Sequence, residues 1–286
     1  MNILVFGKTG QIATELGICA KQKPYTHVTL LDRKVADLKN PSQCADIINS
    51  KKPDIIINAA AYTNVEGAEE EEDLANLING ESPKLMSEAA KLIKSPLIHI
   101  STDYVFDDLF KGPKSTTLKP NPLNAYGRSK LLGEEAILNS GCTYVILRTS
   151  WVFSSYGSNF VKKILNLSIE NQPIGVVEDQ IGGPTSAKEI AKACLTIAQK
   201  LLKDPGLKGI YHLSGSPDVS WASFAEAIVQ KSDKINIKRI KSSSFSSKVI
   251  RPKNSCLDCS NIEKSFGIKR GSWARDLAMV LNDLGS

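Results

Sequence analysis

A tyrosine and a lysine four residues apart, Tyr126 and Lys130, are the residues best suited to chemistry in the sequence. On a helix, positions i and i+4 lie on one face, so the two side chains are neighbours. An ammonium group near a phenol stabilises the phenolate and lowers the pKa of the tyrosine. The spacing therefore predicts that Tyr126 donates and accepts a proton, and that Lys130 tunes it.

Hydroxyl-bearing residues stand upstream of this pair, in Ser101-Thr102-Asp103, directly after an apolar run. A hydroxyl at the end of a strand can hydrogen-bond an oxygen on which negative charge develops. The Tyr-Lys spacing alone also occurs by chance on exposed helices. Its combination with the hydroxyl of Thr102 and with a glycine-containing turn makes the catalytic interpretation specific.

The glycine-containing turn is Gly7-Lys8-Thr9-Gly10-Gln11-Ile12-Ala13, which follows the first apolar run. Glycines let the backbone approach a pyrophosphate, and the start of a helix supplies free N–H groups. The next predicted strand ends at Asp32, which suits the ribose of NAD, whereas Arg33 suits the 2′-phosphate of NADP. Both cofactors stay open, and so does the alternative that Asp32 caps the following turn.

Short apolar runs alternate with helical segments through the first half of the chain. Apolar runs without polar alternation are typical of parallel strands that are covered on both faces. We therefore predict an α/β fold with a Rossmann-type doubly wound parallel sheet. The predicted strands are Ile3–Phe6, Val28–Leu31, Ile55–Asn58, Leu97–Ser101 and Tyr144–Arg148, and the predicted helices are Gln11–Cys19, Pro41–Ser50, Leu74–Ile93 and Ala125–Asn139.

Beyond Thr149, Pro, Gly and Ser become more frequent between shorter elements. We expect residues 1–150 to form the dinucleotide-binding domain and residues 151–286 to form mainly a smaller C-terminal substrate-binding lobe. Segments around 176–190 and 208–216 are expected to return to the Rossmann domain, the latter with a late strand at Ile210–Leu213. Lys241–Lys248, which contains five serines, is predicted to be a loop.

The composition narrows the possible partners and the location. The 286 residues include 36 Lys and Arg against 30 Asp and Glu, and the basic residues are scattered, which makes nucleic acid a poor partner. No apolar run approaches the roughly 18 residues of a membrane span. The N-terminus lacks a secretory signal, so a cytoplasmic protein is expected. Six dispersed cysteines, including the Cys256/Cys259 pair, are predicted to be structural thiols.

Taken together, the motifs resemble those of extended short-chain dehydrogenases and, within them, the dTDP-4-dehydrorhamnose reductase family. The resemblance covers nearly the whole chain. Each motif alone is weak, but the set is specific. The motifs that carry it are Gly7–Gln11, Asn58–Thr63, Ser101–Phe106, Tyr126–Lys130, Arg148–Phe153, Asp179–Thr185, Gly209–Leu213 and Arg251–Ser255.

The resemblance implies an NADPH- or NADH-dependent reduction of the C4 ketone of dTDP-4-dehydro-β-L-rhamnose, the last step in making dTDP-rhamnose for surface polysaccharide. It implies that Tyr126 protonates the carbonyl oxygen, that Thr102 hydrogen-bonds it, and that Lys130 tunes Tyr126 and binds the ribose. The implied cofactor-binding residues are Gly7, Thr9, Gly10, Gln11, Ile12, Asp32, Arg33, Ala59, Ala60, Ala61, Tyr62, Tyr126 and Lys130.

The resemblance also implies a pocket for the nucleotide sugar. Trp151 would border it and Arg251 would bind its diphosphate, since a guanidinium gives bidentate hydrogen bonds. A core aromatic role for Trp151 and a surface ion pair for Arg251 remain the alternatives. The implied substrate-binding residues are Thr102, Asp103, Tyr104, Val105, Trp151, Arg251 and Asn254.

Some members of the family are dimers that bind Mg²⁺ through interface glutamates, which Glu15 and Glu189 match. Ile190 follows Glu189, so a further acidic ligand is missing, and an ordinary role on exposed helices is equally supported. We expect a monomer or a homodimer.

Two other functions stay open. One is the reduction of a different nucleotide-linked 4-keto-6-deoxysugar, UDP-linked or N-acetylated, because the motifs do not resolve the base or the sugar substituents. The other is a non-catalytic regulatory homologue, against which the presence of Thr102, Tyr126 and Lys130 argues. A 4,6-dehydratase would place an Asp-Glu pair directly after the catalytic Thr, whereas here Tyr104 follows Asp103.

Overall fold

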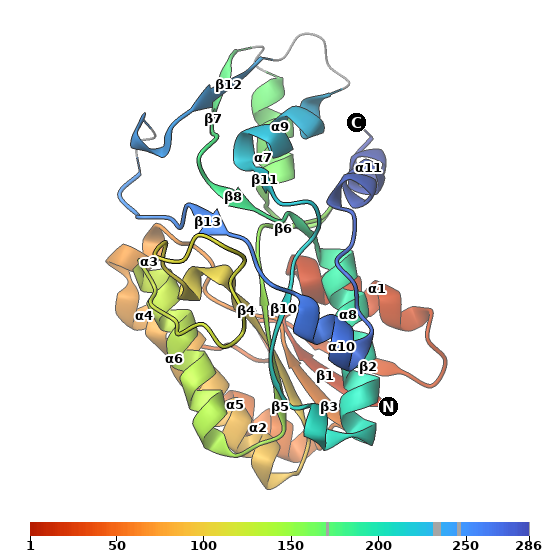
Figure 1. Ribbon diagram of the computed structural model, residues 1–286. Coiled ribbons are helices and arrows are strands. Elements are labelled where there is room, and N and C mark those ends of the chain that lie inside the picture. The colour runs from red at the N-terminus through yellow and green to blue at the C-terminus, as the bar shows by residue number, and fades with distance from the viewer. Residues whose placement is uncertain (170–171, 231–235, 245–246, 286) are drawn as a thin grey trace.

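A six-stranded parallel sheet with helices on both faces forms the larger part of the molecule (Figure 1). The computed structural model describes residues 1–169, 172–230, 236–244 and 247–285. The strand order is β2-β1-β3-β4-β5-β10, and the predicted late strand pairs with β5. All predicted strands are confirmed, and each observed boundary lies within one residue of the expected one. The strands are β1 Asn2–Phe6, β2 His27–Leu31, β3 Ile55–Asn58, β4 Leu97–Thr102, β5 Tyr144–Thr149 and β10 Gly209–Leu213.

Two apolar layers, one on each face of the sheet, explain why the strands are apolar throughout. Successive side chains of a strand point to opposite faces. Ile3 and Val5 pack into one layer, and Leu4 and Phe6 into the other. This confirms the doubly wound arrangement. The first layer is covered by α1 Gln11–Lys21, α8 Ala187–Lys203 and α10 Ser260–Phe266, and the second by α2 Pro41–Lys51, α5 Ser82–Leu92 and α6 Ala125–Ser140.

The predicted helix Leu74–Ile93 contains a π-turn. Two short helices, α3 Gly67–Glu70 and α4 Glu72–Asn76, precede this turn at Leu77–Glu81, and α5 follows it. Asn79 lies in the turn, and its Oδ1 accepts a hydrogen bond from the backbone N–H of Tyr62 (2.9 Å). Single-turn π-bulges occur often at functional sites. Here the bulge fixes the loop that follows β3.

A second, smaller core belongs to the C-terminal elements, which lie above the sheet in Figure 1. It contains Phe153, Ile164, Val176, Phe224 and Leu277. The chain then returns to the sheet through α8 and β10, and the exact division into domains stays a prediction. The elements of this part are β6 Val152–Phe153, α7 Phe160–Ser168, β7 Ile174–Val177, β8 Ile181–Gly182, β9 Thr185–Ser186, β11 Val219–Ser220, α9 Trp221–Val229, β12 Ile237–Ile240, β13 Asn254–Ser255 and α11 Trp273–Asp283, with short 3₁₀ turns at Asp103–Val105, Pro205–Leu207 and Ser242–Ser244.

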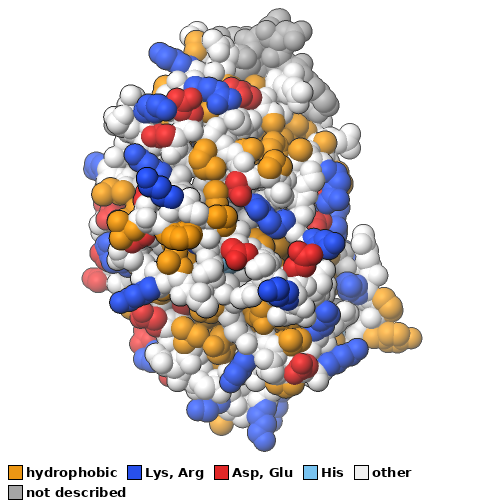
Figure 2. Space-filling view, viewed as in Figure 1, with side chains coloured by type: hydrophobic (Ala, Val, Ile, Leu, Met, Phe, Trp, Pro, Cys, Tyr) orange, Lys and Arg blue, Asp and Glu red, His pale blue; other side chains and the backbone are white. Residues whose placement is uncertain are grey.

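Charged side chains are mixed on the visible surface. Figure 2 shows lysines and arginines interspersed with carboxylates on this face. Within the described ranges, no helix is both long enough and apolar enough to cross a membrane.

A buried ion pair fastens α6, the helix that carries the Tyr-Lys pair, to the sheet. Arg148 of β5 and Glu134 of α6 are almost completely buried, and their charged atoms lie 2.5 Å apart. Ser101 of β4 donates a hydrogen bond to the same carboxylate. Because each charge is withdrawn from water, each depends on the other for compensation.

Replacing Glu134 with Gln should therefore destabilise the protein strongly. The change leaves the Arg148 charge buried without a counter-charge, which costs roughly 3–5 kcal/mol of the free energy of unfolding. Urea denaturation measures this loss. Glu72→Gln is the matched control, since Glu72 pairs with Arg128 of the same helix at the surface, and such pairs contribute about 1 kcal/mol or less. Equal losses in the two variants would contradict the role of the buried pair.

Candidate active site

The loops that follow β1, β2, β3 and β4 meet at the carboxyl edge of the sheet, where open α/β sheets bind ligands. Gly7 has a positive φ of 107°, and a Cβ there would lie 3.4 Å from the carbonyl oxygen of Ala59. The positive φ thus favours glycine here by conformation. No side chain caps the N-terminus of α1 at Gly10, so its first amide groups are available for a phosphate.

The side chain of Gln11 points away from this turn toward the smaller core. Its Oε1 accepts hydrogen bonds from the Ser154 hydroxyl (2.9 Å) and from the Asn159 amide (3.0 Å). Thr9 is exposed, and Ile12 packs into the layer under α1. In this turn it is therefore the backbone that faces a ligand.

Asp32 caps the turn that follows β2, as the alternative interpretation had it. Its Oδ1 accepts hydrogen bonds from the N–H groups of Lys34 (3.0 Å) and Val35 (3.2 Å), and its Oδ2 lies 3.5 Å from Nζ of Lys8. Arg33 is exposed beside it. This end of the site thus carries basic side chains that suit a phosphate as well as a carboxylate that suits a ribose.

Ala59, Ala60, Ala61 and Tyr62 follow β3 and are partly buried at the same edge. The Tyr62 hydroxyl donates a hydrogen bond to Glu71 (2.6 Å). The small alanine side chains leave the backbone of this loop accessible beside the glycine turn.

Tyr126 and Thr102 lie together where β4 ends and α6 begins. Asn124 caps α6, accepting a hydrogen bond from the N–H of Gly127 (2.8 Å). The ring of Tyr104 contacts the ring of Tyr126 edge to face, with centroids 5.5 Å apart. A Cβ on Gly127 would overlap the carbonyl oxygen of Tyr104, so only glycine lets the helix approach this closely.

Burial sets the protonation of the groups around Tyr126. It raises the pKa of Tyr126 to about 12, while the Thr102 hydroxyl lowers this pKa and Asp103 raises it. Burial also raises the pKa of Asp103 to about 6, against hydrogen bonds from Ser255 and Thr102. The Oδ2 atom of Asp103 has no partner among the described residues. The site therefore holds a protonated phenol next to a carboxyl group that titrates near neutral pH.

Lys130 makes its hydrogen bonds to β4. Its Nζ donates to the carbonyl oxygen of Ile100 (2.7 Å) and lies 3.2 Å from Nε2 of His99. Burial lowers the pKa of Lys130 to about 8. The tuning of Tyr126 by Lys130 stays a prediction. Sequence reasoning missed His99, although a polar residue within the apolar run Leu97–Ile100 is itself a signal.

Trp151 follows β5 in a constrained conformation. Its φ is +50°, its ring stacks on Trp221 with centroids 3.6 Å apart, and Gly182 lies against the ring. Sequence reasoning did not single out Trp221.

Arg251 and Asn254 make different kinds of contact. Nη2 of Arg251 lies 3.1 Å from Glu66. Arg251 is also near Tyr104, whose pKa burial raises and Arg251 lowers, and this places it next to the Tyr126 cluster. The amide of Asn254 instead donates to the carbonyl oxygens of Phe110 and Gly112. The structure thus brings Thr102, Asp103, Tyr104, Tyr126 and Arg251 together, whereas Asn254 holds a loop and Val105 is completely buried.

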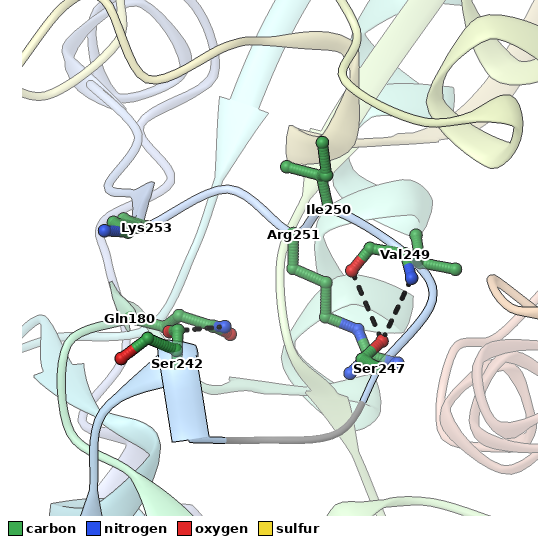
Figure 3. A pocket seen from close by; sticks show the side chains of 8 residues that line it. Gln180, Ser242, Ser247, Val249, Ile250, Arg251 and Lys253 are labelled. Carbon is green, nitrogen blue, oxygen red and sulfur yellow. Dashed lines mark hydrogen bonds between the residues drawn. The ribbon is translucent and has the colours of Figure 1, made fainter.

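A pocket of about 300 Å³ continues from Arg251. Figure 3 shows Arg251 and Lys253 on one stretch of backbone, with Gln180 and Ser242 from other segments. Two cationic residues and several hydroxyl groups suit a phosphorylated ligand. Part of the wall comes from the predicted loop Lys241–Lys248, in which residues 245 and 246 lie outside the described residues. The lining residues are Gln180, Ser242, Ser243, Ser247, Val249, Ile250, Arg251 and Lys253.

The two glutamates expected at a metal lie on neighbouring helices. Glu15 of α1 is buried, and burial raises its pKa. Glu189 of α8 forms an ion pair with Lys192 at 2.8 Å. No group of three or more potential metal ligands gathers in the part of the chain that the structure describes. Cys256 and Cys259 are free thiols, and burial raises the pKa of Cys256 to about 11, as expected for structural cysteines.

The parallel sheet, the glycine-containing turn and the Tyr-Lys helix define a reductase fold of the extended short-chain dehydrogenase class. A sequence model of the family described as RmlD substrate binding domain matches residues 1–286. The chain belongs to this family.

Known proteins resemble this chain in sequence and in structure over nearly its whole length. The dTDP-4-dehydrorhamnose reductase of Sinorhizobium fredii is 42% identical, over 96% of this chain and 94% of its own. The crystal structure of a dTDP-4-dehydrorhamnose reductase from Clostridium acetobutylicum has a TM-score of 0.93 at 32% identity and covers 100% of both chains. That of the Bacillus anthracis reductase in complex with NADP has a TM-score of 0.89 at 33% identity, with 99% of each chain covered.

Gly127→Ala should impair catalysis by displacing Tyr126. The added methyl group must push α6 away from Tyr104, and a misplacement of about 1 Å can cost about 100-fold in rate. We expect kcat to fall by that order while the protein stays folded by circular dichroism. Gly175→Ala is the control, since a Cβ on Gly175 meets only ordinary contacts. Unchanged kcat in Gly127→Ala would show that the close approach is not needed.

Proposed function

We infer that this chain is an NAD(P)H-dependent reductase that converts dTDP-4-dehydro-β-L-rhamnose to dTDP-β-L-rhamnose. The observation that carries this inference is that Tyr126 and Thr102 lie together at the same carboxyl edge of the sheet as the open N-terminus of α1, in a chain of the family to which dTDP-4-dehydrorhamnose reductases belong. The six cysteines are free thiols, which supports a cytoplasmic location.

The residues at the carboxyl edge fit a nicotinamide dinucleotide. The fit rests on the uncapped start of α1 and on Gly7, whose missing side chain keeps the backbone next to Ala59 accessible. We propose that these backbone groups hold the pyrophosphate and that Lys130 holds the nicotinamide ribose. The Bacillus anthracis relative was crystallised in complex with NADP, which supports a nicotinamide dinucleotide as the cofactor. When bound, the reduced cofactor supplies hydride.

In the proposed reduction, the hydride comes from the cofactor and the proton comes from Tyr126. As the C4 carbon gains hydride, the ketone oxygen takes the proton of the Tyr126 hydroxyl, so the product is an alcohol and Tyr126 is left as a phenolate. Thr102 donates a hydrogen bond to the same oxygen and stabilises the negative charge that develops there. The Lys130 ammonium stabilises the phenolate until solvent restores the proton.

The nucleotide end of the substrate is proposed to occupy the pocket that continues from Arg251. The guanidinium of Arg251 suits the diphosphate, and Lys253 adds a second cation. Trp151 is proposed to border the sugar, held in place by its stack on Trp221. The protein is proposed to act as a monomer or as a homodimer, in which Glu15 and Glu189 would be the ligands of any Mg²⁺.

Tyr126→Phe tests the catalytic assignment. The variant lacks the proton donor, so kcat for NADPH oxidation with dTDP-4-dehydro-L-rhamnose should fall roughly 10²- to 10⁴-fold. NADPH affinity, measured by cofactor fluorescence, should stay close to that of the wild type. A fully active variant would show that another group supplies the proton.

The same assay, run with a panel of nucleotide 4-keto-6-deoxysugars under NADH and under NADPH, tests the substrate. We expect the highest kcat/KM with the dTDP-linked 4-dehydrorhamnose. Turnover only with a UDP-linked or N-acetylated sugar would overturn this substrate and keep the reductase.

Arg251→Ala should act mainly on substrate binding. Loss of the diphosphate contact is expected to raise KM at least tenfold, with a smaller change in kcat. Lys269→Ala removes an exposed cation elsewhere and is the control. The outcome that would contradict a diphosphate role is an unchanged KM in Arg251→Ala.

A further inference from the structure

A chain of three buried polar side chains leads from β3 to the catalytic helix. Asn58 of β3 lies 3.1 Å, through Nδ2, from Nδ1 of His99 on β4, and Nε2 of His99 lies 3.2 Å from Nζ of Lys130. Asn58 and Lys130 are at most 2% exposed, and His99 is completely buried. Each hydrogen bond in this chain must therefore be matched, donor to acceptor.

The backbone decides which way the Asn58 amide faces. Its Oδ1 accepts a hydrogen bond from the N–H of Ala60 (3.2 Å). A flipped amide would set the NH₂ group against that N–H, donor against donor. The NH₂ group consequently faces His99, and Nδ1 of His99 must accept.

This orientation determines the tautomer of His99. Burial, the larger influence, holds the pKa of His99 well below its usual value, so the ring is neutral and carries one proton. With Nδ1 as an acceptor, that proton resides on Nε2 and points at Nζ of Lys130. An N–H donor requires a lone pair opposite it, which a neutral amine has and an ammonium lacks.

On this basis, and resting on the proposed function of Tyr126 and Lys130, we propose that Asn58 and His99 are positioning residues for catalysis. They hold Lys130 against the sheet as a neutral amine. Its protonated form is repelled by the Nε2–H of His99 and turns from the ring toward Tyr126, where its charge is needed. His99 thus couples the protonation of Lys130 to its direction.

The charges around Lys130 agree with this assignment. Glu134, one turn along α6, favours the ammonium, but it is bound to Arg148 of β5 and to Ser101 of β4. His99, from β4, is neutral. Tyr126, on the same helix, is protonated, as its raised pKa requires. Burial is the dominant influence and lowers the pKa of Lys130 to about 8.

Imidazole ¹⁵N NMR of the full-length protein tests the tautomer directly, without substrate. The chain has three histidines, and His99→Gln assigns the signal. His212 is an internal reference with the opposite tautomer. Its Nδ1 faces the carbonyl oxygen of Lys114 (3.0 Å) and must donate a hydrogen bond to it. We expect a proton on Nε2 of His99 and on Nδ1 of His212. A proton on Nδ1 of His99 would overturn the proposal.

Asn58→Asp tests the coupling. The carboxylate accepts from both Ala60 and His99, which moves the ring proton to Nδ1 and lets Nε2 accept from the Lys130 ammonium. In the wild type, the ammonium and hence kcat/KM should be lost as the pH rises through about 8, the pKa of Lys130. In the variant the deprotonation of Lys130 should move upward by roughly one pH unit, since an added negative charge and a new acceptor both favour the ammonium. Because Nε2 of His99 now holds that ammonium away from Tyr126, kcat/KM below pH 8 should also be lower than in the wild type.

Asn282→Asp adds a negative charge at an exposed position on α11 and is the control. It should leave the pH at which kcat/KM is lost unchanged. The His99 ¹⁵N shift, followed between about pH 6 and pH 10, reports the same titration without turnover. If the tautomer changes while that titration stays at the wild-type pH, the coupling is wrong. If Asn58→Asp fails to fold, the wild-type tautomer decides the proposal. Failure of the sugar assay alone would overturn only the proposed substrate.

Discussion

The ion pair between Arg148 and Glu134 is the constraint on which the site depends. It lies between β5 and α6, out of reach of water, and Ser101 of β4 completes the shell of the carboxylate. Among the described residues, no other charged group forms an ion pair with either side chain, so the helix is held at the position in which the two groups meet. That position brings the first turns of α6 to the end of β4 and places Tyr126 next to Thr102.

Burial shifts the pKa values of Tyr126 and Lys130, the two side chains proposed for proton transfer, in opposite directions. It raises the pKa of Tyr126 and lowers that of Lys130, so each is driven toward its uncharged form. A site made of neutral donors and acceptors must be ordered by hydrogen bonds, and these come from the strands: Ile100 and His99 for Lys130, and Thr102 for Tyr126. The strands of the sheet therefore orient the side chains of Lys130 and Tyr126 as well as supporting α6.

Local patterns were enough to predict the strands, most helix boundaries and the proximity of Tyr126 to Thr102. Apolar runs and helical composition can be recognised from neighbouring residues alone. The π-turn around Asn79 could not be predicted, since it depends on a hydrogen bond to the distant Tyr62. Likewise, Asn254 carries no local sign that its amide is committed to the loop at Phe110.

The side chain of Gln11 joins two parts of the molecule that are otherwise built around separate cores. Its amide is held by Ser154 and Asn159, while its backbone begins α1 at the glycine-containing turn. Any hinge motion that swings the smaller core away from the sheet must first break these bonds. A ligand that restrains the glycine-containing turn would therefore also restrain the segment that carries Ser154 and Asn159, because the Gln11 amide connects the two.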